Sequence, residues 1–358
     1  MKITIVGGGN IGTQFAVHCS QNNDVIIFTS KPDEFIENIE IVDENDNTTM
    51  IGKHIIATNN ENEAFTNTDI IFITYPAFSM DDISEKIIKY VKPGLKIGII
   101  PGTGGGECAF KKCIENGAIV FGLQRVPSVA RLVEKGKKVK AVGYRNELFV
   151  ASLPKKDTKM ISNIIQNIFN IKCSSLPNYL NLTLTPSNPI LHTTRLRTIF
   201  KNYKDGVTYE SLPLFYEEWD DETSKLLFKC DDEVQKICNN IKEFDLSYVK
   251  SLKKHYESDT PSKLTKKIRS IDGFKGLTTP SKKVKNGLIP DFESRYFTAD
   301  FSYGLSILIQ IGEFLNLNID NMKETMDWYR NISSDIKEYS YKKYGINTYD
   351  DLISFYSK

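Results

Sequence analysis

The feature that most constrains this chain is a glycine pattern that follows its first apolar segment. Residues 2–6 form a β-rich run, residues 7–12 read Gly-Gly-Gly-Asn-Ile-Gly, and residues 11–20 have the pattern of a helix. G-x-G-x-x-G is a weak signal alone, but a strand before it and a helix after it are the context in which it binds a dinucleotide. The sequence therefore predicts a dinucleotide-binding unit at the start of the chain. A glycine turn that binds nothing is the alternative.

The three spaced glycines have separate expected roles. Gly7 allows the tight turn, Gly9 lets the backbone approach the pyrophosphate, and Gly12 lets the helix pack closely on the strand. The free N–H groups at the helix start, at Asn10 and Ile11, then receive the phosphate charge. These five residues are the first expected cofactor contacts.

Strand-like and helix-like segments alternate through the first half of the chain. The β-rich runs after the first one lie at residues 25–28, 39–56, 70–74, 97–100 and 118–122. Such alternation implies a parallel, doubly wound sheet. From about residue 182 the chain is mostly helix-length segments, and the Lys-rich stretch 263–285 reads as a loop with a short helix. We therefore expect an α/β Rossmann-type domain over residues 1–181 and an all-α domain over residues 182–358.

The composition excludes several kinds of partner. Lys and Arg total 46 and Asp and Glu total 45, and this balance argues against nucleic acid because phosphate binding needs a basic excess. No apolar run is long enough to span a bilayer, and the first residues enter a strand rather than a signal peptide, so we expect no membrane partner. The six cysteines have neither a C-x-x-C pair nor metal-ligand spacing, which favours a reducing, cytoplasmic setting and predicts no metal site.

The residues after the second β-rich run select the cofactor. An acidic residue there would bond the ribose 2′-hydroxyl of NAD and repel a 2′-phosphate. This chain has Thr29, Ser30 and Lys31 instead. Because a serine can donate to a phosphate and a lysine adds positive charge, we expect NADP(H) rather than NAD(H), with Ser30 and Lys31 as contacts. The alternative is that Lys31 is a solvated surface residue and the cofactor is NAD(H).

Two further turns follow runs whose carboxyl ends should face the cofactor crevice. Pro76 and Ala77 follow the run 70–74 and would let the chain pass near the nicotinamide. Residues 101–106 include four glycines, which permit unusual φ values and close approach to a ligand. Thr103 and Gly104 are therefore expected to contact the substrate, and an ordinary long turn is the alternative.

One of the four histidines stands out as a candidate for acid–base chemistry. The other three read as structural or solvated residues: His18, His54 and His255. His192 lies about one turn into the first helix of the second domain, with Ser187 as the expected cap and Pro189 in the first turn. That helix end should border the cleft between the domains, where ligands commonly bind. An imidazole titrates near neutrality, so His192 could donate a proton to a carbonyl oxygen or take one back.

A second cluster lies at residues 295–300. Arg295 could clamp a substrate carboxylate through two hydrogen bonds. Asp300 could hold His192 in one tautomer and stabilise its protonated form. An ordinary surface Arg–Asp pair is the alternative.

In these residues and in the segments around them, the chain resembles the octopine/nopaline (opine) dehydrogenases. Beyond the Gly-rich start, the resemblance runs through residues 71–77, 102–105, 188–192, 215–217 and 295–305. It implies a Rossmann domain followed by a helical domain, a catalytic pair at His192 and Asp300, and Arg295 on the carboxylate of a 2-keto acid. Asn188, which begins the Asn-Pro-x-x-His element, is then expected beside the substrate.

The reaction that the resemblance implies is reductive condensation, in which a 2-keto acid and the amine of an amino acid form an imine that NAD(P)H reduces. One alternative is a simple 2-keto acid or ketopantoate-type reductase, and another is a non-catalytic NAD(P) sensor. The acidic run 217–222 departs from the family pattern; we expect a solvated face, with a site for a cationic amino substrate as the alternative. Tyr339, Tyr341 and Tyr344 would pack on the helical domain or on another subunit, so a homodimer stays open.

Overall fold

The computed structural model describes residues 1–334 and 336–358 and divides into two compact units. The first unit is Met1–Thr183 together with Ser354–Lys358, and the second is Leu184–Ile353. The expected boundary lay after residue 181, with all later residues in the second domain. The last five residues pack with the first unit because Tyr356 donates a hydrogen bond of 2.6 Å to the buried carboxylate of Glu107.

The first unit is built on a mixed sheet. Within the described residues the strand order is β12-β11-β8-β7-β6-β1-β2-β5. The strands are β1 (Lys2–Val6), β2 (Asp24–Phe28), β5 (Ile56–Thr58), β6 (Ile70–Ile73), β7 (Lys96–Ile99), β8 (Ile119–Leu123), β11 (Glu147–Leu153) and β12 (Lys172–Ser175). All neighbouring strands pair in parallel except β8 and β11. Strands β11 and β12 therefore run opposite to the other six strands of this sheet. The predicted doubly wound sheet is confirmed.

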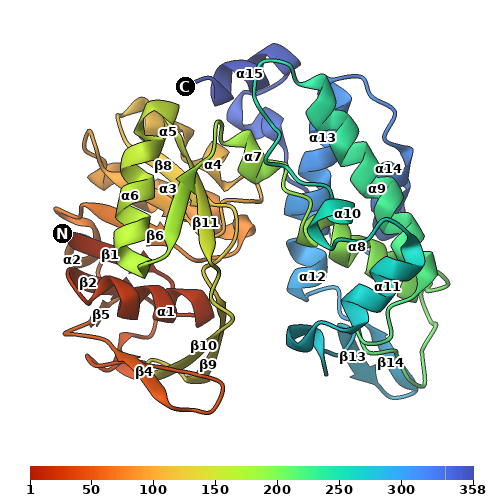
Figure 1. Cartoon of the computed structure of the whole chain (residues 1–358), viewed down its shortest axis with the longest axis horizontal. Helices are drawn as coiled ribbons and strands as arrows, with labels where there is room; N and C mark the ends of the chain where they lie inside the picture. Colours follow the sequence, from red (N-terminus) through yellow and green to blue (C-terminus); the bar gives the residue numbers. More distant parts are fainter. Residues whose placement is uncertain (335) are drawn as a thin grey trace. The chain divides into compact units, whose positions relative to one another are not determined.

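Helices cover both faces of this sheet. The helices of the first unit are α1 (Asn10–Cys19), α2 (Glu61–Phe65), α3 (Met80–Ile87), α4 (Gly106–Ala109), α5 (Lys111–Glu115), α6 (Thr158–Phe169) and α7 (Leu180–Thr183). Helices α1 and α6 lie on one face, and α3 and α5 on the other (Figure 1). Phe15 of α1 packs edge-on against Phe72 of the sheet and Phe169 of α6, at 5.3 and 4.7 Å between ring centroids. Burial of such aromatic and β-branched side chains is the main force that holds the layers together.

The sheet order marks the edge of the sheet where a cofactor crevice is expected. Strand β1 pairs with β2 on one side and with β6 on the other, so the connections leave β1 in opposite directions. In open α/β sheets the crevice lies beyond the carboxyl ends of the strands at such a switch point. The glycine loop after β1 and residues 74–77 after β6 therefore lie at the cofactor end of the sheet.

A smaller sheet of order β4-β3-β10-β9 adjoins the first. Its strands are β3 (Glu40–Val42), β4 (Thr48–Ile51), β9 (Val129–Glu134) and β10 (Lys138–Val142). The β structure expected over residues 39–56 is confirmed as the β3–β4 hairpin. Strand β9 was not expected, and its turn into β10 carries Lys135 next to Glu34, with 2.5 Å between the ammonium and the carboxylate.

The second unit is helical. Its helices are α8 (Asn188–Ile199), α9 (Asp221–Asn240), α10 (Leu252–His255), α11 (Pro261–Arg269), α12 (Arg295–Thr298), α13 (Ser306–Phe314) and α14 (Asp320–Ile332), with the start of α15 (Tyr349–Tyr356). Helix α11 is the short helix expected in the Lys-rich stretch 263–285, and a hairpin of β13 (Ser281–Val284) and β14 (Gly287–Pro290), which was not expected, begins at the end of that stretch. The backbone of Tyr209 bonds to Leu288 and supports the outer edge of β14.

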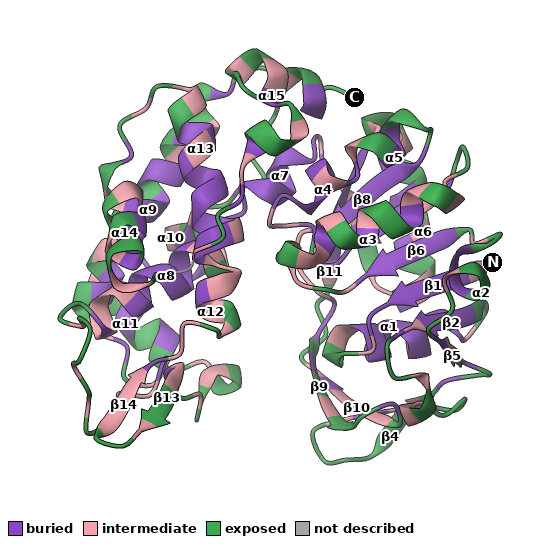
Figure 2. Ribbon diagram, turned by 180° about the vertical axis from the view of Figure 1, so that it is seen from behind, coloured by how far each residue is buried: buried purple, intermediate pink, exposed green. Residues whose placement is uncertain are grey.

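Helix α8 is the centre of this unit. It packs against α9 and α14, and Figure 2 shows it buried along most of its length. Residues Ile190–Leu196 are all buried, although they include His192, Thr193, Thr194 and Arg195. Because buried polar groups are costly without hydrogen-bond partners, a buried helix with this composition needs a specific network around it.

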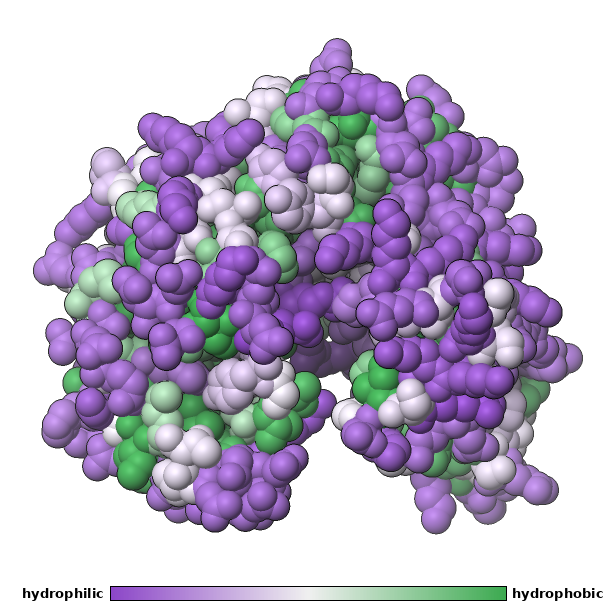
Figure 3. Space-filling view, in the orientation of Figure 1, coloured by the Kyte–Doolittle hydropathy of each residue, from purple (hydrophilic) through white to green (hydrophobic). Residues whose placement is uncertain are grey.

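The surface seen in Figure 3 is mainly hydrophilic, with scattered apolar residues. Of the helices that the structure describes, none is long and apolar enough to cross a bilayer.

The tyrosines near the end of the chain pack within the helical unit. The rings of Tyr339 and Tyr341 are buried and lie 5.0 Å apart, and the ring of Tyr344 lies 5.6 Å from that of Tyr339.

Candidate active site

His192 is held from both sides of its imidazole ring. Nδ1 lies 2.7 Å from Oδ2 of Asp300, and Nε2 lies 2.7 Å from Oη of Tyr216. A carboxylate only accepts hydrogen bonds, so Nδ1 carries the proton and donates to Asp300. In the neutral ring Nε2 then accepts from the Tyr216 hydroxyl. The structure thus joins His192 and Asp300, which are 108 residues apart in the chain.

The approach of the Asp300 segment to α8 depends on a glycine. Asp300 precedes a π-helical turn, Phe301–Leu305, and Gly304 in this turn lies against Pro189 of α8. A Cβ on Gly304 would come within 2.7 Å of Cγ of Pro189. Pro189 lies in the first turn of α8 as predicted. Ser187 stands at the N-cap, but its side chain makes no capping hydrogen bond.

Tyr216 is the member of the site that sequence reasoning missed. It is 4% exposed, and burial raises its pKa far above the usual value, with the neighbouring Tyr296 and Tyr256 contributing. The phenol therefore stays protonated over the pH range of ordinary enzyme assays. Tyr216 lies in a loop before α9, where no periodic pattern marks it, and the only signal was its place in the segment 215–217 that resembles the opine dehydrogenases.

Aromatic rings enclose the imidazole. The ring of Tyr296 lies 4.4 Å from that of His192 at 37°, and the ring of Phe215 lies at 5.7 Å. Phe274 stacks on Tyr216 with 4.1 Å between centroids. This enclosure limits water around the His192–Asp300 pair, and a lower local dielectric strengthens its electrostatic interaction.

Arg195 fixes the loop that carries Tyr216. Its side chain is 1% exposed, and it donates from Nε to the Phe215 carbonyl at 2.9 Å and from Nη2 to the Glu218 carbonyl at 2.7 Å. Nη1 also pairs with Asp220 at 2.7 Å. Arg195 lies three residues after His192, so one helix positions both the histidine and the loop that covers it.

Three carboxylates of the acidic run 217–222 accept hydrogen bonds from backbone N–H groups. Glu217 accepts from the N–H of Gly276, and Glu218 accepts from the N–H of Leu214, each at 2.6 Å. Asp220 caps α9 through the N–H of Thr223 at 2.7 Å. These three carboxylates anchor backbone, which accounts for their presence without a cationic ligand.

Arg295 and Asn188 lie near the His192–Asp300 pair along the chain. Arg295 begins α12, is exposed, and precedes Tyr296, whose ring contacts the imidazole. Asn188 is the exposed first residue of α8, four positions before His192, so both side chains point to the same side of the helix. The remaining histidines have other surroundings: burial lowers the pKa of His18 to about 4, and His54 is exposed on the surface.

In the first unit, the glycine loop has the geometry that a dinucleotide needs. Gly7 has a φ of +110°, and a Cβ on Gly12 would lie 1.8 Å from the carbonyl oxygen of Gly7. A Cβ on Gly9 would meet nothing within 4 Å, so the outer side of the loop is open there. No side chain caps the start of α1, while the amide oxygen of Asn10 accepts from the N–H of Leu132. The first N–H groups of α1, at Asn10 and Ile11, thus suit a phosphate.

Ser30 and Lys31 follow β2 on the surface. Lys31 lies 3.5 Å from Glu34, and Lys135 contacts the same carboxylate. A hydrogen bond from Lys135 holds the pKa of Glu34 below its usual value. Two lysines therefore meet beside the end of β2, and the sequence signalled only one of them.

Two loops complete the cofactor end of the sheet. Thr74 donates to the Val6 carbonyl at 3.1 Å and joins the turn after β6 to the glycine loop, with Pro76 and Ala77 following. After β7, Gly104 has a φ of +85°, and Thr103 before it is half-buried. Only glycine adopts such a φ without strain.

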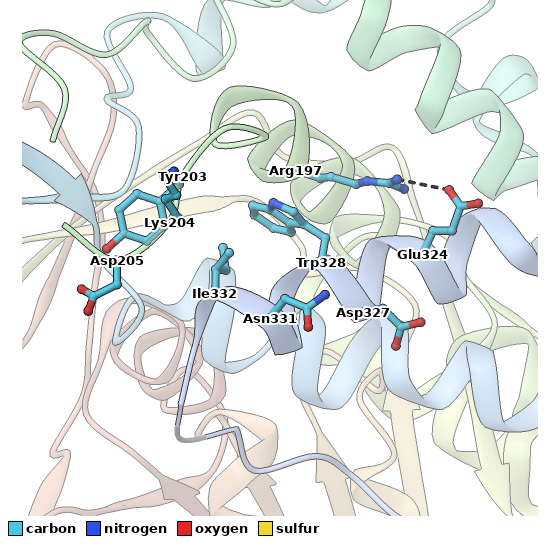
Figure 4. Close-up of a pocket in the computed structure, with 9 residues that line it drawn as sticks. All are labelled: Arg197, Tyr203, Lys204, Asp205, Glu324, Asp327, Trp328, Asn331 and Ile332. Carbon is cyan, nitrogen blue, oxygen red and sulfur yellow. Dashed lines mark hydrogen bonds and ion pairs between the residues drawn. The ribbon is translucent and has the colours of Figure 1, made fainter. Parts of the chain in front are cut away.

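A separate pocket of about 540 Å³ opens on the helical unit (Figure 4). Trp328 and Ile332 form its apolar part, and Arg197 at its edge pairs with Glu324 at 3.2 Å. It shares no lining residue with the site around His192. This pocket is therefore distinct from the cluster of residues around His192.

Comparisons with known proteins agree with this arrangement. Residues 175–333 match the family model described as NAD/NADP octopine/nopaline dehydrogenase, alpha-helical domain, and residues 2–104 match the N-terminus of NAD-dependent glycerol-3-phosphate dehydrogenase. The first match spans His192, Tyr216, Arg295 and Asp300. Tauropine dehydrogenase of Arabella iricolor is 27% identical over 98% of this chain and 99% of its own length. Octopine dehydrogenase of Mizuhopecten yessoensis is 25% identical over 92% and 89%.

Solved structures show the same fold. Octopine dehydrogenase with NADH and L-arginine superposes with a TM-score of 0.84 at 20% identity, over 99% of this chain and 98% of that one. A doubly wound NAD(P)-binding unit followed by a helical unit with a partly buried His–Asp pair defines the class of two-domain NAD(P)-dependent dehydrogenases. Within that class, the relatives that match nearly the whole chain are opine dehydrogenases, which are NAD(P)-dependent oxidoreductases acting on CH–NH bonds, and the helical unit matches the family model of octopine/nopaline dehydrogenases.

Proposed function

We propose that this protein is an opine-type dehydrogenase that joins a 2-keto acid to the amino group of an amino acid with NAD(P)H. The observation that carries the proposal is the 2.7 Å hydrogen bond between Nδ1 of His192 and Asp300, which lies within the segment that matches the family model. A pair of this kind serves acid–base chemistry because the carboxylate fixes the tautomer and stabilises the imidazolium.

His192 acts twice in the proposed reaction. It takes a proton from the substrate ammonium, which frees the amine to attack the keto carbon. It then returns that proton to the hydroxyl group of the adduct, which leaves as water. Asp300 favours the charged imidazole between the two events. Bound NAD(P)H supplies the hydride that completes the reduction.

The substrate carboxylate is the proposed ligand of Arg295, whose planar guanidinium matches it with two parallel hydrogen bonds. Asn188 on the same side of α8 as His192, and Thr103 and Gly104 in the first unit, are the other proposed substrate contacts. Octopine dehydrogenase structures with pyruvate and with L-arginine support a small keto acid and an amino acid as the two substrate classes.

NADP(H) is the proposed cofactor. Ser30, Lys31 and Lys135 supply a hydroxyl and two ammonium groups beside the end of β2, where a 2′-phosphate would lie. The glycine residues 7, 9 and 12, the helix start at Asn10 and Ile11, and the turn at Pro76 and Ala77 form the rest of the proposed cofactor site. No disulfide joins cysteines in the described part of the chain, which supports a reducing, cytoplasmic setting.

A matrix of 2-keto acids against amino acids, with NADH and with NADPH, tests the proposal. We expect NADPH oxidation that needs both substrates, and a secondary amine dicarboxylate or its sulfonate analogue identified by mass spectrometry. NADPH oxidation with the keto acid alone, indifferent to every amine, would instead support a simple keto acid reductase. Cofactor binding without turnover of any pair would support a sensor.

A further inference from the structure

The glycine-rich loop 102–106, which follows β7, depends on contacts at its two ends. Four of its five residues are glycine, and Gly104 and Gly105 have positive φ values of +85° and +69°. Glycine loses more conformational freedom on folding than any other residue, so such a loop keeps one conformation only when its ends are fixed. Thr103 and Gly104 are proposed substrate contacts, and whatever fixes these ends therefore positions them.

The first end of the loop is fixed by backbone contacts. The N–H of Gly102 donates to the carbonyl of Leu123 at 2.8 Å. A Cβ on Gly102 would lie 2.7 Å from Cα of Gly122 and 2.9 Å from the side chain of Leu182 in α7. This end therefore lies directly on β8 and α7.

The second end is fixed by a buried carboxyl group. Glu107 follows the loop in the first turn of α4 and is 0% exposed. Its Oε1 accepts a hydrogen bond of 2.6 Å from the hydroxyl of Thr183, the last residue of α7, and another of 2.6 Å from the hydroxyl of Tyr356. Both donors are buried too. A carboxyl group is costly to bury without such donors, so the position of Glu107 depends on them.

The two donors belong to segments that are themselves anchored. The side-chain amide of Asn178 donates to the backbone oxygen of Tyr356 at 2.7 Å, and its Oδ1 accepts from the N–H of Leu180 at the start of α7. The N–H of Lys155 donates to the backbone oxygen of Lys358 at 2.8 Å. Helix α7 and the end of α15 thus form a fixed support for Glu107.

We propose that Glu107 is a positioning residue of the proposed reaction: its carboxyl group ties the loop 102–106 to Thr183 and Tyr356, and so sets where Thr103 and Gly104 meet the substrate. The inference rests on the proposed function, because that function gives the loop its substrate. Tyr356 lies 249 positions after Glu107 in the chain, so a distant segment supports the substrate loop.

Three variants remove the donors to Glu107 and keep the space filled: Thr183→Val, Tyr356→Phe and the double variant. We expect the Michaelis constant for the 2-keto acid to rise about five- to tenfold in each single variant and further in the double variant, because each lost hydrogen bond loosens the end of the loop. The affinity for NADPH, whose proposed contacts follow β1, β2 and β6, should stay within about twofold.

Glu107→Gln is the conservative variant. Its amide oxygen can accept from both hydroxyl groups in place of Oε1, and Oε2 forms no hydrogen bond within the described part of the chain. The Michaelis constant should therefore stay within about twofold of the parent value. Thr4→Val is the matched control, since Thr4 is buried in β1 of the same unit and its hydroxyl donates to the carbonyl of Ala64. It should lose stability as Thr183→Val does and keep the Michaelis constant.

Amide hydrogen exchange of residues 102–108 measures the loop directly and needs no substrate. Well below the unfolding temperature, exchange should become faster in the three donor variants and stay unchanged in Glu107→Gln and Thr4→Val. Unchanged exchange in the donor variants would overturn the inference, even if one of them failed to fold.

Two further outcomes would also overturn it. A Glu107→Gln variant as impaired as the double variant would assign the effect to charge rather than to the hydrogen bonds. A Thr4→Val variant with the same rise in the Michaelis constant as Thr183→Val would assign it to stability alone. A parent that joins no keto acid to an amine defeats the proposed function, although loop exchange still responds. A parent that joins them, beside donor variants with unchanged Michaelis constants, defeats only the inference.

Discussion

Gly304 lies directly against Pro189, so closely that a single added carbon would fall 2.7 Å from the proline ring. This contact joins the turn that follows Asp300 to the first turn of the helix that carries His192. The backbone of Gly304 thus passes close to the ring of Pro189, next to the segment that carries Asp300. We therefore expect this close approach to influence the distance between Asp300 and His192.

The first prediction concerns this contact. Gly304→Ala should push the turn away from α8, lengthen the bond between Asp300 and His192, and lower kcat by at least about tenfold, with a loss of roughly 1–3 kcal/mol in the free energy of unfolding. Urea denaturation and steady-state assays measure the two effects. Gly273→Ala is the control, because a Cβ there would meet nothing within 4 Å. Equal behaviour of the two variants would show that the contact does not matter.

Arg295 gives the second prediction. Arg295→Lys keeps the charge but removes the planar pair of donors, so the Michaelis constant for the keto acid should rise about tenfold or more while NADPH binding is unchanged. Arg330→Lys is a suitable control, since Arg330 pairs with Glu338 and Asp327 on the surface. An unchanged Michaelis constant in Arg295→Lys would remove Arg295 from the substrate site.

The third prediction addresses the choice of cofactor. Lys31→Ala and Lys135→Ala should each raise the Michaelis constant for NADPH several-fold and leave that for NADH nearly unchanged, because only the 2′-phosphate needs the positive charge. The NADPH effect should shrink at high salt, as expected for exposed charges. Lys137→Ala on the same turn serves as control, since Lys137 pairs with Glu134 instead. Identical effects on both cofactors would contradict the preference for NADP(H).

The fourth prediction uses a buried carboxyl group in α9. Asp231 is fully buried, and burial raises its pKa from 3.8 to about 7. Between these pH values the folded protein binds a proton that the unfolded chain has lost, so this group makes stability fall as the pH rises through that window. Asp231→Asn should therefore stabilise the protein at pH 8 by roughly 2–4 kcal/mol and have little effect near pH 4.

The amide of the Asp231→Asn variant can still accept from the N–H of Leu252, which the carboxylate accepts at 2.8 Å. Unfolding curves in denaturant at several pH values give the measurement. Asp232→Asn, at an exposed neighbour that pairs with Lys253, should change stability by less than about 1 kcal/mol at every pH. A stability difference for Asp231→Asn that does not vary with pH would show that the carboxyl group titrates normally.

Some elements escaped sequence reasoning because their stability comes from distant partners. The β13–β14 hairpin lies in a Lys-rich stretch without a clear β pattern, and its outer edge is held by the backbone of Tyr209. Strand β9 pairs with β10, which follows it in the chain, and the side chain of Asn10 accepts a hydrogen bond from the N–H of Leu132 in β9. Tyr209 and Asn10 lie far from these strands in the sequence, so local propensity could not reveal their contribution.

The dinucleotide loop and the class of fold could be predicted from the amino-acid sequence, because a glycine turn between a strand and a helix is specified by consecutive residues and their allowed φ values. His192, Arg295 and Asp300 could also be named as candidates. The contacts of Asp300 with Nδ1 and of Tyr216 with Nε2, and the role of Arg195 in holding the loop, became visible only in the folded chain. The physical reason is that these contacts depend on how buried helices pack, and packing joins side chains whose spacing along the chain carries no information about their distance.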